Sequence, residues 1–268
     1  MAENGQIRIA LAGNPNCGKT TMFNNITGAK QHVGNYAGVT VEKKEGYKKF
    51  DGHELLFIDL PGTYSLTARS LDELVARNVI VNDNPDVIVN VLDASNLERN
   101  LYLAAQLLEL EKPMVIALNM SDVAEDMGIK YDLKKMAEMT GATIVSTVGR
   151  TNIGTKELLE ATVSVAASQK APGVTINYGD LLEGKISELV EELKQAGTVT
   201  YPLRWVAVKL LEKDADVIGK VMRFENTEAV IEKAKAIREE IKDQVDLDVI
   251  FQEYRHRFAV EVYNTCLT

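Results

Sequence analysis

The sequence is poor in the residues that build disulfide frameworks, zinc sites and membrane helices. Its 268 residues include two cysteines, Cys17 and Cys266, and three histidines that lack the spacing of metal ligands. No stretch approaches the roughly 18 to 20 consecutive apolar residues that a membrane helix needs. The N-terminus MAENGQIRIA also lacks the basic and then apolar layout of a signal peptide. These absences predict a soluble cytoplasmic chain with reduced thiols and no zinc site.

Basic residues are in deficit. The chain has 30 Lys and Arg against 39 Asp and Glu, which gives a formal net charge of -9. Because nucleic-acid-binding proteins usually carry a basic excess, we expect no nucleic-acid partner. Apolar residues make up 46% of the chain, which is enough for substantial cores, and the length suits two domains.

Runs of strand length alternate with helical patterns in the first part of the chain. Two of these runs, 86–94 and 113–119, are near-continuously apolar, as in strands that are buried on both faces. Asp51-Gly52 between two other runs indicates a hairpin. The alternation predicts an α/β fold in which helices cover a mostly parallel sheet. We expect its strands at 6–12, 41–49, 53–59, 86–94, 113–119 and 143–147.

Helix signals fall between these strands. A helix is expected from about Lys19 to Thr27, with Gly28 in the left-handed position that follows a helix. Ser95-x-x-Glu98 has the pattern of a capping box, which predicts a helix start at Ser95. Another helix is expected after about residue 154.

The strand pattern ends at a short, polar stretch that is rich in breakers, QKAPG at 169–173. Beyond it, apolar residues recur at helical spacing in three stripes, which we interpret as the core of a small helical domain. The stripes are Ile186, Leu189, Val190 and Leu193; Leu203, Val206, Ala207, Leu210 and Leu211; and Val230, Ala234, Ile237 and Ile241. The sequence therefore predicts two domains, 1–170 and 171–268, of which the second is all-helical.

The stretch GNPNCGKTT follows the first predicted strand and opens a helix, and it matches the phosphate-binding pattern G-x-x-x-x-G-K-[ST]. In such a loop, backbone N–H groups face phosphate oxygens, the Lys neutralises them, and the next hydroxyl binds Mg²⁺. Here these side chains are Lys19 and Thr20. The candidate nucleotide-binding residues are Gly13, Asn14, Pro15, Asn16, Cys17, Gly18, Lys19, Thr20 and Thr21.

A second motif, Asp59-Leu60-Pro61-Gly62, follows another predicted strand. Asp59 is a candidate to hold Mg²⁺ through water, and the Gly62 amide is a candidate sensor of the γ-phosphate. Taken alone, D-L-P-G also suits an ordinary turn.

A third motif, Asn119-Met120-Ser121-Asp122, ends the strand at 113–119. The Asp122 carboxylate can accept hydrogen bonds from guanine N1–H and the 2-amino group, which adenine does not offer. Taken alone, Ser121 or Asp122 would equally serve as a helix cap. Lys19 and Asp59 are 40 residues apart, and Asp59 and Asn119 are 60 apart. This joint spacing resembles that of Ras-like GTPases and predicts a guanine-nucleotide site.

Together with the stretches VGNYAGVTVE, LDELVARN and VLDASNLERNLYL, these motifs resemble the cytosolic N-terminal region of the prokaryotic ferrous iron transporter FeoB. The resemblance covers both predicted domains. It implies a Ras-like GTPase domain, then a helical domain of the dissociation-inhibitor type, and then an iron-carrying membrane region outside this chain. It also implies a place at the cytoplasmic face of the inner membrane, and it leaves a homo-oligomer open.

The resemblance assigns the first switch to the stretch 31–42. Its single threonine, Thr40, is the candidate that reaches Mg²⁺ and the γ-phosphate in the GTP state. Gly38 and Val39 precede it as further nucleotide-binding candidates.

The loop expected to contact the base departs from the family pattern. Ser146, Thr147 and Val148 are its candidate residues, but the usual Ser-Ala pair falls on Val148 and Gly149. The contact to guanine O6 is therefore open. Cys17 also stands where the family often has Ser or Ala, and we interpret it as a tolerated small residue rather than a reactive thiol.

The position after Gly62, where many Ras-like enzymes have a glutamine, is Thr63. In GTPases that resemble this chain, the second asparagine of the phosphate loop holds K⁺, and Asn16 has that position. The catalytic candidates are Lys19, Asn16, Thr40 and Gly62. The metal candidates are Thr20, Thr40 and Asp59 for Mg²⁺ and Asn16 for K⁺.

Two other functions stay open at this point. One is a GTPase of tRNA modification or ribosome assembly, although the acidic helical part argues against it. The other is a nucleotide-sensing switch with negligible turnover. Asp72 and Glu73 are expected to begin a solvated helix rather than bind Fe(II).

Overall fold

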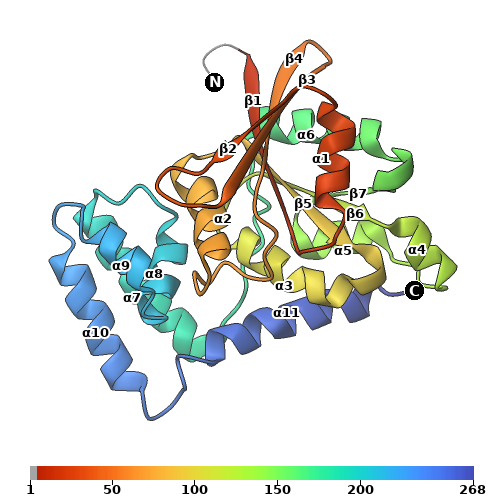
Figure 1. Ribbon diagram of the computed structural model, residues 1–268. Helices are drawn as coiled ribbons and strands as arrows, with labels where there is room; N and C mark the ends of the chain where they lie inside the picture. Colours follow the sequence, from red (N-terminus) through yellow and green to blue (C-terminus); the bar gives the residue numbers. More distant parts are fainter. Residues whose placement is uncertain (1–4) are drawn as a thin grey trace. The chain divides into compact units, whose positions relative to one another are not determined.

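The structure is a computed structural model that describes residues 5–268 (Figure 1). Its sheet has the strand order β2-β3-β4-β1-β5-β6-β7. The strands β1, β4, β5, β6 and β7 are parallel, whereas β3 is antiparallel to β4 and β2 to β3. The bounds are β1 (Gln6–Gly13), β2 (Gln31–Asn35), β3 (Glu42–Phe50), β4 (His53–Asp59), β5 (Val87–Asp93), β6 (Met114–Asn119) and β7 (Thr143–Ser146).

Helices connect the parallel strands and cover the sheet (Figure 1). They are α1 (Lys19–Thr27), α2 (Leu71–Asn82), α3 (Leu97–Leu108), α4 (Ser121–Asp126), α5 (Leu133–Thr140) and α6 (Thr155–Ser168), with short 3₁₀ turns η1 (Ala94–Asn96) and η2 (Gly149–Thr151). The later part of the chain has only helices: α7 (Gly179–Ala196), α8 (Leu203–Leu211), α9 (Ala215–Val221), α10 (Glu228–Ile241) and α11 (Ile250–Cys266). The predicted fold class, a mostly parallel α/β sheet followed by helices, is confirmed.

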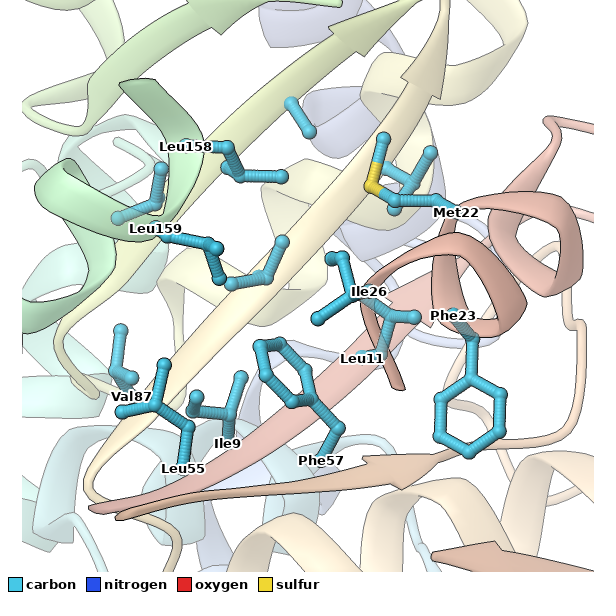
Figure 2. Close-up of a cluster of buried hydrophobic side chains, with 14 of the residues drawn as sticks. Ile9, Leu11, Met22, Phe23, Ile26, Leu55, Phe57, Val87, Leu158 and Leu159 are labelled. Carbon is cyan, nitrogen blue, oxygen red and sulfur yellow. The ribbon is translucent and has the colours of Figure 1, made fainter. Parts of the chain in front are cut away.

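Alternation along the strands builds the core on one face of the sheet. Side chains from β1, β4 and β5 meet side chains from α1 and α6 in one buried cluster (Figure 2). Figure 2 labels Ile9, Leu11, Met22, Phe23, Ile26, Leu55, Phe57, Val87, Leu158 and Leu159. Because successive strand residues point to opposite faces, Ile9 and Leu11 fall on the same side. This packing fixes β1 against α1, and so it fixes both ends of the phosphate loop between them.

The predicted hairpin turn is present. Asp51 and Gly52 connect β3 to β4, with φ of 46° and 77°. Positive φ at both central residues is the geometry of a two-residue turn that follows the twist of the strands, and it favours Asp-Gly. The sequence signal for this hairpin therefore had a direct conformational cause.

One strand was not predicted, and one local prediction was wrong. Residues 31–35, within the stretch assigned to the first switch, form β2, an edge strand; four of its five residues are exposed, so no apolar alternation marked it. The capping box at Ser95 does not form, because the Ser95 hydroxyl donates to Asp93 Oδ1 at 2.6 Å. Asp93 instead caps the 3₁₀ turn η1, and α3 begins at Leu97.

The chain divides into two compact units, residues up to Val174 together with Ala259–Thr268, and Thr175–Phe258. In the first unit, the end of the chain contacts the segment before α5: Asp132 N–H donates to the carbonyl of Cys266 at 2.8 Å. Thr268 N–H donates to the Lys130 carbonyl at 2.9 Å. A domain boundary after 170 stays a prediction. None of the helices within residues 5–268 is both long and apolar enough to span a bilayer.

In the second unit, the three predicted stripes lie on α7, α8 and α10, and most of their residues are buried. Beside them, Glu212 binds two buried cations. Lys209 Nζ lies 2.7 Å from Glu212 Oε2, and Arg255 Nη1 lies 2.6 Å from Oε1. Burial alone would raise the pKa of Glu212, but the charges and hydrogen bonds of Lys209 and Arg255 outweigh it and lower that pKa to about 2.

We therefore expect Glu212→Gln to destabilise the chain by about 3 to 5 kcal/mol, because it leaves two buried cations without their anion. The pKa of Glu212 is 4.5 when unperturbed and about 2 in the fold. Its stabilisation is thus complete above pH 4.5 and is lost as the pH falls through 2. Urea unfolding followed by circular dichroism at pH 7 and at pH 3 measures the free energy of unfolding of the wild type and of Glu212→Gln. The difference between the two proteins should be smaller at pH 3 than at pH 7.

The matched control is Glu232→Gln, which removes the same charge from the exposed pair with Lys235 in the same unit. It should leave the unfolding midpoint nearly unchanged. Equal stability of the Glu212→Gln and Glu232→Gln variants at pH 7 would contradict the assigned role of the buried pair.

Candidate functional site

The site forms at the carboxyl ends of the parallel strands. The segment 14–18 connects the end of β1 to the start of α1. Asn16 and Gly18 adopt φ of 68° and 85°, which turns the loop tightly. A Cβ on Gly18 would overlap the side-chain nitrogen of Asn119 at the end of β6. Only glycine at position 18 lets these two segments approach so closely.

Lys19 is buried and turns toward the end of β4. Its Nζ donates to Asp59 Oδ1 and to the Leu60 carbonyl, the latter at 2.6 Å. Backbone hydrogen bonds also join the segment after β4 to the end of β1. Leu60 N–H donates to the Leu11 carbonyl at 3.0 Å, and Thr63 N–H donates to the Gly13 carbonyl at 3.3 Å. The two motifs, 40 residues apart, therefore lie against each other.

A cavity of about 560 Å³ opens beside this pair. The predicted magnesium residues Thr20, Thr40 and Asp59 all line it. The remaining lining residues are Lys19, Val41, Glu42, Lys44, Leu60, Pro61, Gly62, Leu71 and Asp72. Gly38 and Val39 are outside this lining and belong to a turn in which Val39 N–H donates to the Tyr36 carbonyl at 3.2 Å.

Asn119 joins the phosphate loop to the loop after β7. Its Nδ2 donates to the Cys17 carbonyl at 2.9 Å, and its Oδ1 accepts from Gly149 N–H at 2.8 Å. Thr147 Oγ1 also donates to Asn119 Oδ1, at 3.3 Å. Both polar atoms of the Asn119 side chain are therefore engaged in hydrogen bonds within the chain. These bonds bring together the predicted base-contacting segments 119–122 and 146–149.

Asp122 lies in the first turn of α4. The N-cap of this helix is Met120, with φ of 58° and no side-chain cap bond. The Ser121 hydroxyl instead donates to the Thr147 carbonyl at 3.1 Å. The alternative that Ser121 or Asp122 serves as a cap is therefore wrong. The Asp122 carboxylate accepts from Arg150 Nη2 at 2.9 Å.

The loop expected to contact the base has its own internal partners. Val148 N–H donates to the Ile153 carbonyl at 3.0 Å, and Gly149 N–H is the group bound to Asn119. Ser146 is exposed at the end of β7. The two amides that align with the family's base contact are thus engaged within the chain. Arg150 is a residue that the sequence reasoning missed, although a charged side chain after Gly149 was a readable signal.

Cys17 is buried in the phosphate loop. Burial raises the pKa of its thiol to about 11, so the group stays protonated and unreactive at neutral pH. Asn14 is buried as well, and its Nδ2 donates to the Arg99 carbonyl at 3.4 Å. Within residues 5–268, Asn14 Oδ1 is buried without a hydrogen-bond partner.

The segment after Gly62 is ordered by α2. Glu73 accepts from Ser65 Oγ at 2.8 Å, Thr67 Oγ1 at 3.1 Å and Arg69 N–H at 2.9 Å. Glu73 N–H donates in turn to Ser70 Oγ, the N-cap. Sequence reasoning missed these contacts, because a spacing of four to eight residues in a polar turn has no periodic signature. No His, Cys, Asp or Glu cluster in the described part of the chain could hold a metal ion.

Two sequence families match the chain. The one described as Ferrous iron transport protein B matches residues 7–162. The one described as FeoB cytosolic helical domain matches residues 178–268.

Curated relatives of this chain are longer, and the chain matches only part of their length. A Fe(2+) transport protein A/Fe(2+) transporter FeoB fusion protein of Porphyromonas gingivalis is 45% identical over 216 residues, which are 79% of this chain and 26% of that protein. The Fe(2+) transporter FeoB of Escherichia coli K12 is 40% identical over 78% of this chain and 27% of its own length. The chain thus spans about a quarter of these curated relatives.

Solved structures match over nearly the whole chain. A mutant of S. thermophilus NFeoB bound to GDP is 35% identical, with a TM-score of 0.89 and coverage of 97% of this chain and 99% of that one. The cytosolic domain of T. maritima FeoB in its GMPPNP form is 32% identical, with a TM-score of 0.85 and coverage of 98% and 99%. The resemblance drawn from the motifs is thereby confirmed: the chain belongs to the ferrous iron transport protein B family and carries its N-terminal G domain and its cytosolic helical domain.

Proposed function

We propose that this chain binds GTP and GDP with Mg²⁺ and slowly hydrolyses GTP, as the regulatory part of a prokaryotic Fe(II) uptake transporter. The observation that carries the proposal is that Asn119 binds the phosphate loop and the loop after β7 at once. This contact supports our proposal of a phosphate site at Lys19 and a base site at Asp122, along one edge of the sheet. Ligands of open α/β sheets bind at that edge.

The phosphate end fits a nucleotide. The loop 13–18 has the positive-φ residues and the helix start that direct amide groups toward an anion. A Cβ at Gly13 would lie 2.7 Å from both Cys17 Sγ and the Val91 carbonyl, so this position also needs glycine. A triphosphate would draw Lys19 from Asp59, because phosphate oxygens offer the ammonium group more negative charge.

The oxygen atoms around the cavity fit Mg²⁺. Thr20, Thr40 and Asp59 supply two hydroxyls and a carboxylate, which are hard ligands of the kind that Mg²⁺ prefers. Bound there, Mg²⁺ would offset negative charge on the β- and γ-phosphates. Asp59 would hold it through water once Lys19 has turned to phosphate, and the Gly62 amide would face the γ-phosphate.

The base end favours guanine over adenine. The Asp122 carboxylate is half-buried and can accept only, so it suits the N1–H and 2-amino donors of guanine. At the same position, adenine N1 would meet the carboxylate as a second acceptor. Met120, the N-cap of α4, lies two residues before Asp122, and we propose that it borders this site.

The chain offers few groups for hydrolysis. Thr63 replaces the usual glutamine and is buried, with its amide bound to Gly13. The basic residues that line the cavity are Lys19 and Lys44, with no arginine among them. Asn16 is exposed at the turn of the phosphate loop, where its side-chain oxygen would help to hold K⁺. The cation would supply positive charge between the β- and γ-phosphates.

The whole-protein role rests on the relatives. They are named Fe(2+) transporters, and the present chain spans about a quarter of their length, so we propose that a membrane region carries the iron. Residues 1–170 would then be the GTPase domain and 171–268 a helical domain that passes its state to that region at the cytoplasmic face of the inner membrane. A tRNA-modification or ribosome-assembly GTPase is disfavoured by the match of 178–268 to a FeoB domain. A switch with negligible turnover is separated by the rate measurements below.

Asp122→Asn should weaken GDP binding and move the preference toward xanthine nucleotides. The variant exchanges an acceptor for a donor, which costs about 1 to 3 kcal/mol, roughly 5- to 150-fold in affinity. Titrations with fluorescent GDP and XDP measure it, and Asp126→Asn on the exposed face of the same helix is the control. Unchanged GDP affinity in Asp122→Asn would overturn the assignment of the base site.

Thr40→Ala should leave GDP affinity near the wild-type value and impair GTP hydrolysis, because the hydroxyl would reach Mg²⁺ only in the triphosphate state. Thr40→Ser keeps the hydroxyl and should retain activity. GDP titration and single-turnover hydrolysis give the two readouts. Equal losses of GDP and GTP binding in Thr40→Ala would mean that the residue is structural.

Replacement of Na⁺ by K⁺ at constant ionic strength should raise steady-state GTP hydrolysis, since the smaller Na⁺ fills the site poorly. Asn16→Ala should abolish this difference while GDP binding stays nearly intact. Asn24→Ala, an exposed change on α1, should keep it. Equal wild-type rates in both salts at saturating GTP would rule the mechanism out, and the stimulating charge would then come from the membrane region or a partner.

A further inference from the structure

The base-specificity carboxylate of this chain has a partner from the neighbouring loop. Arg150 Nη2 lies 2.9 Å from Asp122 Oδ2. The Arg150 side chain is 76% exposed and that of Asp122 28%. The guanidinium therefore approaches the carboxylate from the solvent side, which is the side from which a base would arrive.

The loop fixes the start of the Arg150 side chain. The preceding residue is held by both of its backbone polar groups: Gly149 N–H donates to Asn119 Oδ1, and Asn25 Nδ2 donates to the Gly149 carbonyl. Thr151 N–H then donates to the Val148 carbonyl at 3.1 Å and closes the 3₁₀ turn η2. Since both neighbours of Arg150 are tied down, the loop fixes the backbone from which the Arg150 side chain reaches Asp122.

Guanidinium and guanine offer a carboxylate the same chemistry. Guanine presents two N–H donors side by side in one plane, from N1 and the 2-amino group. The planar fork of an arginine presents parallel N–H donors in the same way and adds a full positive charge. Asp122 is an acceptor for both.

We infer that Arg150 is an intramolecular competitor of the guanine base for Asp122, and that it lowers the affinity of the site for guanine nucleotides. The inference rests on the proposed guanine-nucleotide function. An internal competitor divides the molecules into those with a free carboxylate and those without, and the apparent affinity falls by the free fraction. The residue thus tunes how readily nucleotide is exchanged.

The expected size is set by the exposure of the pair. Exposed ion pairs shift an equilibrium by about 1.5- to 5-fold, and salt screens them. Arg150→Ala should therefore tighten GDP binding by about 1.5- to 5-fold at low salt, and the gain should shrink as the salt concentration rises. A role in supporting the loop alone would predict weaker binding and no such salt dependence.

The experiment is a titration of the 268-residue chain with fluorescent GDP at low and high NaCl. It compares wild type, Arg150→Ala, Asp122→Asn and the double variant. Lys156→Ala is the matched control, because it removes one exposed positive charge six residues further along the chain, from a pair with Glu160 on α6. In the Asp122→Asn background, the Arg150→Ala change should have no effect, since the contested charge is gone.

Tighter GDP binding in Arg150→Ala, with Lys156→Ala unchanged and no effect in the Asp122→Asn background, is the expected result. Unchanged or weaker GDP binding in Arg150→Ala, while the wild type binds GDP, would overturn the competition and leave the proposed function standing. An equal gain in Lys156→Ala would reduce the effect to general electrostatics and also overturn it. If neither wild type nor Arg150→Ala binds GDP, the proposed function itself fails, and the inference fails with it.

Discussion

The bond pair made by the Asn119 side chain holds the candidate site together. Its Nδ2 reaches the Cys17 carbonyl and its Oδ1 receives the Gly149 amide, so one buried amide joins the segments that follow β1, β6 and β7. The Cys17 carbonyl and the Gly149 N–H are both buried. Either group would lose its hydration without gaining a hydrogen bond if the Asn119 side chain were removed, which would destabilise the fold. The close approach requires glycine at position 18, because a side chain there would collide with Asn119. The spacing between phosphate and base regions is therefore a property of the folded core.

Motif positions could be predicted from the sequence because they follow strands. Asp59 and Asn119 end the buried apolar strands β4 and β6, the phosphate loop that leads to Lys19 follows β1, and parallel strands bring such ends to one edge. The edge strand β2 and the Arg150 contact could not be predicted in this way. β2 is polar and exposed, and it is specified by its pairing with β3 rather than by its own pattern. Arg150 depends on a loop whose shape is set by distant hydrogen bonds.

The chain holds a buried ion triad and a buried ion pair, which differ in how open they are to exchange with a ligand. Glu212 faces both Lys209 and Arg255, with the arginine binding both carboxylate oxygens at 2.6 and 3.2 Å. Such a bidentate arrangement compensates desolvation within the protein and suits a permanent support. Lys19 and Asp59 lie instead on the wall of an open cavity. Each can exchange its partner for a ligand from that cavity, as a phosphate oxygen for Lys19 or hydrated Mg²⁺ for Asp59.

The segment between Gly62 and α2 is held at its far end. Leu66 N–H donates to Gln106 Oε1 at 2.5 Å, and the Leu66 carbonyl accepts from the buried Arg77 at 3.3 Å, while the Leu66 side chain is itself buried. Beyond it, Glu73 binds Ser65 and Thr67. A displacement that begins at Gly62 meets this anchor within four residues. It must then be absorbed by residues 63–65, or it must break the Leu66 contacts and move α2 and α3 with them. Breaking the Leu66 contacts would couple the cavity to α2 and α3, which pack on the sheet. The free energy needed to break the hydrogen bonds of Leu66 to Gln106 and Arg77 sets the threshold for that motion.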